Sequence, residues 1–411
     1  MERTKNILFI SYDGMTDLLG QSQVIPYLTG LTKFGFQFTI LSCEKPDRYA
    51  FNKDEIEKVL HPFPIKWAPI RYHKNPQVFS SIYDVYNLKK KAKQLHSSEN
   101  FDLVHTRPGI PALVGLWMKN HFQIKFLNDV REFYADSRMD GEMWNQKIFF
   151  YRKIYHFFKR KENEAIEKSD GIVCLTYAAK KIILNTSAYK NGTPIDVIPC
   201  SVDMKLFDPE KVDIPSKLRL KAELNIHEND FIFSYLGSVG SWYLLDELMD
   251  FFKIMNDKIP NAKFLFISPD NHEIIMSEAK RAALDQTKIL IKKAKRTEVP
   301  ALLSLVNFSA FFIKPCYSKQ SSSPTKHAEI MAMGIPVITN SGVGDVADIV
   351  EKYKSGLVIE NFDKQNFESA ADAIAAETYF DKNSIRRAAF EYYDLDEAVE
   401  KYRKIYQEII P

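Results

Sequence analysis

The amino-acid sequence predicts an α/β protein made of two doubly wound domains, each with a parallel sheet. The chain has 411 residues, too long for one ordinary core and suited to two domains of roughly 200 residues each. Short apolar runs alternate with longer amphipathic segments, which is the pattern of βαβ units. This alternation breaks at 198–215, where prolines interrupt regular structure, and then starts again.

The first half contains short runs rich in Ile, Val, Leu and Phe, which we expect to be buried parallel strands. These strands are expected at 7–11, 38–42, 103–105, 125–129, 171–175 and 196–199. The amphipathic stretches between them predict helices at 23–34, 81–96, 109–120, 146–168 and 177–185.

The second half repeats the pattern, with strands expected at 231–236, 263–268, 288–292, 309–313 and 336–339. Helices are expected at 243–258, 271–283, 299–305 and 324–333, and a last amphipathic helix at 394–410. We therefore expect domains at 1–205 and 206–392, followed by a C-terminal helix at 393–411 that packs back on the first domain. Ligands of doubly wound sheets bind at the carboxyl ends of the strands, so the expected site is the cleft between the domains.

Charge and composition exclude several classes of protein. Fifty-six Lys and Arg residues against 53 Asp and Glu leave a net charge of +3, so no general field attracts nucleic acid. The apolar run near the start is only 7–10, shorter than the roughly 7–15 residues of a signal peptide, and no run approaches the ~20 residues of a membrane span. The four cysteines show no metal-binding spacing, and a cytoplasmic location is expected.

The most informative run is 321–338, which begins S-S-S-P-T-K-H-A-E. It predicts a hydroxyl-rich N-cap, with Pro324 in the first turn of a short helix. A helix N-terminus binds anions, and Lys326 adds a full positive charge there. Glu329 follows one turn later, where its carboxylate could accept hydrogen bonds from a ribose diol. The run therefore indicates a sugar-nucleotide site, with plain capping and surface residues as the alternative.

This run resembles the donor site of GT-B fold glycosyltransferases, especially the retaining family 4 (group 1) enzymes, in a subgroup with an S-P-T-K form. The family has a Glu-x7-Glu motif, whose second glutamate binds the ribose hydroxyls. Glu329 matches that glutamate, and Ser321 occupies the position of the first, which contacts the donor sugar. The resemblance implies a GT-B architecture, a glycosyltransferase activity, and a Lys326 side chain that faces the diphosphate.

Three segments of the first domain are expected at the cleft. The loop at 11–23 resembles the family's first glycine loop and contains Asp13 as a candidate acceptor-side residue. Arg107 follows a strand at a position where many family members have a histidine facing the donor sugar. It could instead bind a phosphate or carboxylate, or form a surface salt bridge. The acidic and basic loop at 128–141 predicts an acceptor-side pocket, with a solvated loop of internal ion pairs as the alternative.

In the second domain, the turn at Gly237 and Ser238 is expected to bring backbone N–H groups to a phosphate. The arginine and Lys-Gly pair that clamp the diphosphate in much of the family are absent, so Lys314, Lys319 or Lys326 should supply the charge. The candidate catalytic residues are Arg107, Lys326 and Glu329. The candidate donor-binding residues are Gly20, Gln21, Gly237, Ser238, Lys314, Ser321, Ser323, Thr325, Lys326 and Glu329. The candidate acceptor or cleft residues are Asp13, Asp129, Arg131, Asp136 and Arg138.

These residues predict transfer of a sugar from a nucleotide diphosphate sugar to a hydroxyl of a glycan or lipid-linked acceptor. Retention follows from the resemblance, and neither a metal nor another cofactor is expected. The segments at 149–161 and 81–95 combine rings with cations, which favours contact with the inner face of a membrane. Their alternative is a domain helix with rings in the core. A sugar-nucleotide epimerase using His327 and Asp13, and a non-catalytic partner protein, are the alternative functions.

Overall fold

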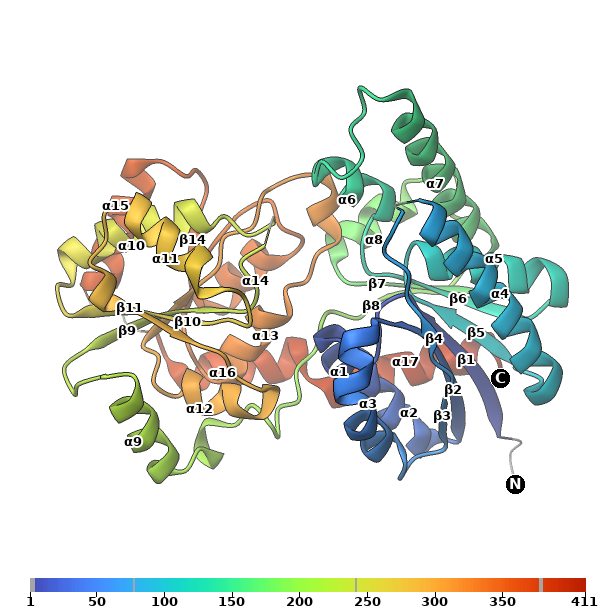
Figure 1. Cartoon of the computed structure of the whole chain (residues 1–411), viewed down its shortest axis with the longest axis horizontal. Helices are drawn as coiled ribbons and strands as arrows, with labels where there is room; N and C mark the ends of the chain where they lie inside the picture. The colour runs from blue at the N-terminus through green and yellow to red at the C-terminus, as the bar shows by residue number, and fades with distance from the viewer. Residues whose placement is uncertain (1–3, 77, 241, 377–379) are drawn as a thin grey trace. The chain divides into compact units, whose positions relative to one another are not determined.

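The structure is a computed structural model that describes residues 4–76, 78–240, 242–376 and 380–411 (Figure 1). Contacts divide it into two compact units, one of Met1–Pro199 with Leu395–Pro411 and the other of Cys200–Asp394. Each unit contains one parallel sheet with helices packed against it. The expected fold class, two doubly wound α/β domains, is confirmed.

The first unit has its strands in the order β3-β2-β1-β5-β6-β7-β8, with β4 beside β2, and all their pairings are parallel. In the central strand, Ile7 pairs with both Phe38 and Leu103, and apolar side chains cover both faces. The strands are β1 (Lys5–Ser11), β2 (Phe36–Glu44), β3 (Ile65–Trp67), β4 (Ile70–Arg71), β5 (Leu103–Thr106), β6 (Lys125–Val130), β7 (Gly171–Cys174) and β8 (Ile195–Val197).

The helices of the first unit are α1 (Leu18–Gln23), α2 (Ile25–Leu31), α3 (Pro46–Leu60), α4 (Phe79–Glu99), α5 (Ile110–Phe122), α6 (Tyr134–Asp140), α7 (Phe149–Lys168), α8 (Tyr177–Leu184) and α17 (Leu395–Ile409). The helix expected at 23–34 is confirmed as α2 and the 3-10 turn Thr32–Phe34, but it begins at Ile25, because Val24 leaves the helical conformation and Pro26 lies in the first turn of α2. Helix α3 was not expected, because only Ile56 and Leu60 of it are buried and its apolar period is weak.

The C-terminal helix α17 packs beside α2 in the first unit (Figure 1). Its apolar face includes Tyr402 and Tyr406, which are buried in the core under the sheet. A methyl group added at Gly30 of α2 would lie 2.7 Å from the Val399 side chain, so the glycine permits the close approach of the two helices. The chain therefore returns from the second unit to complete the core of the first.

The second unit has a sheet in the order β11-β10-β9-β12-β13-β14, again parallel. Its strands are β9 (Phe231–Leu236), β10 (Ala262–Ile267), β11 (Ile289–Lys292), β12 (Phe308–Ala310), β13 (Val337–Asn340) and β14 (Gly356–Ile359). Its helices are α9 (Ile214–Glu223), α10 (Leu245–Lys258), α11 (His272–Arg281), α12 (Val299–Leu303), α13 (Thr325–Ala332), α14 (Val346–Tyr353), α15 (Lys364–Ala375) and α16 (Lys382–Tyr393). The sequence did not predict β14 or α14 to α16.

Phenylalanine dominates the core of the second unit. The ring centroid of Phe233 lies 5.0 Å from that of Phe264, 5.8 Å from Phe251 and 6.0 Å from Phe252, and all four side chains are fully buried. Burial of each such ring contributes roughly 1.5–3 kcal/mol. Much of the aromatic content, 13% of the chain, therefore serves packing.

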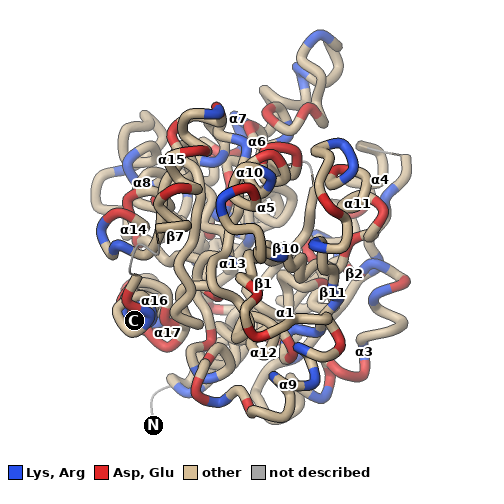
Figure 2. The backbone as a smooth tube through the Cα atoms, turned by 90° about the vertical axis from the view of Figure 1, so that its left-hand side faces the viewer, with Lys and Arg blue, Asp and Glu red and all other residues tan. Residues whose placement is uncertain are grey.

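No helix in the described ranges is long and apolar enough to cross a membrane. Lys and Arg alternate with Asp and Glu along the helices in the view of Figure 2, in keeping with the small net charge.

Candidate functional site

Lys326 lies near the start of α13, beside the carboxyl end of β9 in the second unit. Its Nζ donates a hydrogen bond to the Tyr235 hydroxyl at 2.9 Å and lies 4.0 Å and 3.7 Å from the ring centroids of Tyr235 and Tyr243. The side chain is buried, and among the described residues no carboxylate lies within 4 Å of Nζ. Burial lowers the pKa of Lys326 well below its ordinary value. A lysine amine is thus buried here without a matching anion.

The turn after β9 is shaped around this lysine. Gly237 has φ +107°, and a methyl group added to it would lie 3.2 Å from Lys326 Nζ. The Tyr235 hydroxyl donates to the carbonyl of Ser238 at 2.5 Å, and the Val239 N–H donates to Asp270 at 2.6 Å. Because the Gly237 N–H already donates to a carbonyl of β10, it is the Ser238 amide that can face a ligand.

The N-terminus of α13 differs from the expectation. The N-cap is Pro324 in an extended conformation, and no side chain caps the helix, so the predicted hydroxyl cap is wrong. The Ser323 hydroxyl instead accepts the N–H of Cys200 at 3.2 Å, and the fully buried Ser321 donates to Ser318 at 2.8 Å. The half-buried Thr325 begins the helix. The serines therefore fix the loop, which leaves the first N–H groups of α13 without a side-chain cap.

Glu329, one turn after Lys326, is buried rather than a surface residue. Its Oε1 accepts a hydrogen bond from Arg296 at 2.5 Å, an arginine that precedes α12. Burial raises the pKa of Glu329, and the neighbouring guanidinium opposes that rise. Since Arg296 holds one oxygen, the carboxylate is fixed in orientation and can offer Oε2 to a ligand hydroxyl.

A further cation lies at the same edge of the second sheet. Lys319 Nζ lies 3.6 Å from the ring centroid of Trp242, and the Lys314 N–H donates to the Trp242 carbonyl at 2.9 Å. The loops that follow β9 and β12 are therefore joined. Ser241, within the expected phosphate turn, lies outside the described residues.

In the first unit, Arg107 follows β5 and is buried, with 7% of its surface exposed. Its Nε lies 3.9 Å from the carboxylate of Asp13, which is 46% exposed at the side chain. This distance is an ion pair but not a hydrogen bond. The buried Nε has no hydrogen-bond partner among the described residues.

Two of the predicted acceptor-side residues lie inside the first unit. Asp129 accepts a hydrogen bond from Tyr402 of α17 at 2.9 Å and pairs with His105 and Arg131, each at 3.4 Å. The carboxylate has a pKa lowered to about 2: burial opposes ionisation, but Arg131 and His105 outweigh it. Arg131 also donates to Tyr402 at 3.2 Å and to Gln23 at 3.3 Å. These contacts bind α17 to the sheet.

Two further charged residues of this loop, Asp136 and Arg138, have partners in the first unit. Asp136 accepts from Lys159 at 2.8 Å and from Tyr155 at 2.9 Å. Arg138 donates to Glu132 at 2.5 Å, and its guanidinium lies 3.6 Å from the ring centroid of Tyr134.

The first glycine loop is folded on itself. A methyl group at Gly20 would lie 2.3 Å from the carbonyl oxygen of Gly14, and Gln21 donates to the Thr16 carbonyl at 3.3 Å. Glu44, at the end of β2, accepts from the N–H groups of Met15 and Thr16 at 2.7 and 3.2 Å. The glycine thus permits backbone contact within the loop.

Comparison with known proteins decides the family of the second unit. Residues 216–391 match the family model described as "Glycosyl transferases group 1". The second unit is a group 1 glycosyl transferase domain. No curated protein sequence matches the chain.

Solved structures similar to the whole chain share the GT-B fold of this glycosyltransferase. Sucrose-phosphate synthase from Thermosynechococcus elongatus is 15% identical with a TM-score of 0.75, covering 98% of each chain. A glycosyltransferase from Rickettsia africae is 17% identical with a TM-score of 0.71, covering 99% of each chain. HepE from Anabaena is 13% identical with a TM-score of 0.70, covering 98% of this chain and 99% of the other.

Two residues that organise the glycosyltransferase's loops were missed by the sequence reasoning, namely Glu44 and Arg296. Neither belongs to a local motif, because each meets its partner across about 30 residues of chain. His327, proposed for an epimerase, is fully buried; its Nδ1 meets the Tyr393 hydroxyl at 3.1 Å, and burial lowers its pKa to about 3. Its imidazole is therefore a neutral core group.

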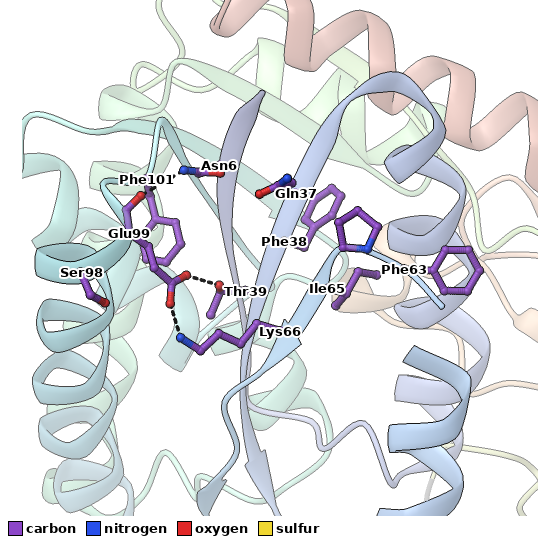
Figure 3. Close-up of a pocket in the computed structure, with 11 residues that line it drawn as sticks. Asn6, Gln37, Phe38, Thr39, Phe63, Ile65, Lys66, Ser98, Glu99 and Phe101 are labelled. Atoms are coloured by element: carbon purple, nitrogen blue, oxygen red, sulfur yellow. Dashed lines mark hydrogen bonds and ion pairs between the residues drawn. The ribbon is translucent and has the colours of Figure 1, made fainter. Parts of the chain in front are cut away.

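A cavity of about 650 Å³ in the first unit lies at the amino ends of β1, β2 and β3 (Figure 3). Glu99 accepts a hydrogen bond from Thr39 at 2.5 Å and pairs with Lys66, so its carboxylate is engaged by its neighbours. Ligands of such sheets bind at the opposite, carboxyl ends, where Arg107 lies.

Proposed function

We propose that this glycosyltransferase binds a nucleotide diphosphate sugar on its second unit and transfers the sugar to a hydroxyl of a glycan or lipid-linked acceptor. We further propose that the anomeric configuration is retained and that no metal is required. The observation that carries the proposal is Lys326, a buried cation without a carboxylate partner beside the Gly237 turn.

Lys326 and its surroundings fit a diphosphate. A buried ammonium is costly unless an anion compensates it, and phosphate oxygens would supply the missing charge. The Ser238 amide and the uncapped start of α13 add donors at the same edge of the sheet. These groups would stabilise the negative charge that develops on the leaving diphosphate. In other enzymes a bound metal ion stabilises such charge.

Glu329 is the proposed ribose ligand. Its Oε1 is held by Arg296, so the free oxygen keeps one direction and accepts a ribose O–H without losing much conformational entropy. Structures of HepE are described as complexes with UDP and with UDP-glucose, which supports a uridine nucleotide as the first donor to test.

Binding and product analysis test this function. The full chain is titrated with uridine, adenosine and guanosine diphosphates and followed by thermal unfolding, since a ligand at 100 times its Kd adds about 2.7 kcal/mol of stability. The matching nucleotide sugar is then supplied with and without EDTA, and the product anomer is read by NMR. Absence of binding by all three nucleotides would contradict the donor assignment, and an inverted anomer would contradict retention.

We also propose that α7 contacts an anionic membrane surface. Only Ala165 and Ile166 of this helix are buried, so its N-terminal rings do not pack in the core. Phe149 is 64% exposed and Phe150 51% exposed, and Lys153 lies 5.2 Å from the ring centroid of Phe149. Exposed rings beside cations fit a headgroup layer that carries negative charge.

Vesicle flotation tests this contact. The full chain should float with phosphatidylglycerol vesicles more than with phosphatidylcholine vesicles, and the double change Phe149→Ser and Phe150→Ser should reduce the bound fraction. Phe51→Ser is the matched control, because Phe51 is 89% exposed on α3. Equal flotation of the double variant and the control would refute the contact.

A further inference from the structure

Arg107 differs from the buried Arg131 and the half-buried Arg138 of the first unit in the contacts of its guanidinium. Arg131 donates to Asp129, Tyr402 and Gln23, and Arg138 donates to Glu132 and lies against a tyrosine ring. A guanidinium has five N–H donors. The Arg107 side chain donates none of them to any residue in the described ranges, although it is nine-tenths buried.

The carboxylate nearest to Arg107 does not satisfy it. Asp13 Oδ2 lies 3.9 Å from Nε, beyond hydrogen-bond distance, and the Asp13 side chain is 46% exposed and therefore hydrated. A buried polar group without a partner in a folded protein calls for an explanation, and an absent ion or ligand is one. The hydrogen-bond donors of the guanidinium are therefore not used by Asp13.

The backbone around Arg107 also favours an anion. Its own N–H donates to the Ile10 carbonyl, so the residue is fixed at the carboxyl ends of β1 and β5. Helix α5, of 13 residues, begins three positions later at Ile110, and its N-cap Gly109 provides no side-chain cap. Gly109 has φ +73°, and a methyl group there would lie 2.2 Å from the Tyr134 ring, so this turn requires glycine. The positive end of a helix thus begins three residues after Arg107 in the chain.

We propose that Arg107 binds an anionic group, a carboxylate or phosphate, carried by one of the two substrates of the transfer reaction. Guanidinium matches both groups through paired N–H···O bonds. The proposal rests on the proposed function, because it assigns the chemistry of a substrate of that reaction. The anion can belong to the donor sugar or to the acceptor, and Arg107 then selects against neutral substrates.

Calorimetric titration of the full chain separates these sources. In the donor arm, UDP-glucuronate is compared with UDP-glucose. In the acceptor arm, glucose 6-phosphate is compared with glucose at saturating UDP. In one arm, we expect the wild-type chain to bind the anionic compound at least tenfold more tightly than its neutral counterpart. In Arg107→Met, the ratio of the two Kd values should fall below threefold. Arg71→Met, a change at an exposed arginine of β4, should keep the preference.

The outcomes distinguish this proposal from the proposed function. A wild-type chain that binds UDP but shows no preference in either arm overturns the Arg107 site alone, and so does a preference that survives in Arg107→Met. A chain that does not bind UDP overturns the donor assignment instead.

A stability measurement excludes a purely structural role. Since Arg107 donates no side-chain hydrogen bond to the described residues, Arg107→Met should leave the melting temperature unchanged or raise it, whereas Arg131→Met should lower it. An equal fall in both variants would show that Arg107 supports the fold and would overturn the inference.

Discussion

Replacing Lys326 by methionine should weaken nucleotide binding while leaving the fold almost as stable as before. The change removes one hydrogen bond to Tyr235, worth about 1 kcal/mol, and two ring contacts of roughly 0.5–1 kcal/mol each. It also removes a buried charge that has no carboxylate partner, and replacing such charges by apolar groups often gains about 1–4 kcal/mol. The two effects nearly cancel, so we expect the free energy of unfolding to change by no more than about 1 kcal/mol.

The effect on binding should be larger, because a hydrogen bond to a charged group contributes about 1.5–3 kcal/mol. This corresponds to roughly a 10- to 150-fold rise in the Kd for UDP. A bound diphosphate should also restore the lowered pKa of Lys326, so that binding takes up a proton. As pH rises from the depressed pKa of the free protein towards the ordinary value, wild-type affinity should therefore fall, by at most tenfold per pH unit.

The assay is calorimetric titration of UDP between pH 8 and 9.5, where the terminal phosphate, whose second pKa is about 6, is almost fully ionised. Wild type should show the fall in affinity, Lys326→Met should bind weakly with no dependence on pH in this range, and urea unfolding should show both proteins to be folded. Lys364→Met is the matched control, because Lys364 is 82% exposed at its side chain in the same unit. A Lys326→Met variant that binds UDP within twofold of wild type would refute the reasoning.

Three further predictions concern other parts of the molecule. If Glu329 accepts from the ribose, wild type should bind UDP at least tenfold more tightly than 2′,3′-dideoxyuridine diphosphate, and Glu329→Ala should lose that preference in the same titration. The pKa of Asp129 is lowered from 3.8 to about 2, so its ionisation stabilises the folded state by on the order of 2 kcal/mol. This contribution is complete above pH 3.8 and is lost as pH falls through 2. Urea unfolding of wild type should show the loss, and Asp129→Asn should lack it. Gly30→Ala places a methyl group 2.7 Å from Val399 and should destabilise the packing of α17 by about 1–3 kcal/mol, measured by urea unfolding; an unchanged midpoint would contradict the packing account.

The parallel sheets could be predicted because buried strands are continuous apolar runs, and β9 was expected at its observed bounds. Elements with little buried surface could not be predicted in this way. Helix α3 buries only Ile56 and Leu60, and β4 is two residues long, so neither has a periodic signal. The division at Val24 shows a second limit, since a helical period alone does not reveal where a proline starts a new helix.

In the candidate site, sequence reasoning found the residue types but not their partners. Lys326 and Glu329 were recognised from one short run, and both lie at the carboxyl edge of the second sheet. Arg296, which orients Glu329, lies 33 residues earlier, and no spacing rule connects the two. Ser323 was expected to cap α13, but it bonds to Cys200, 123 residues away, because the loop before the helix packs on the segment that enters the second unit.

The two arginines at 107 and 131 show why such partners decide function. Both follow a strand of the first sheet, both are 7% exposed, and each has a carboxylate oxygen within 4 Å. What separates them is Tyr402, 271 residues beyond Arg131, which returns on α17 to accept a hydrogen bond from that arginine. The guanidinium of Arg131 therefore donates its hydrogen bonds within the first unit, whereas that of Arg107 donates none to the described residues. For that reason we assign Arg107, and not Arg131, to the substrate.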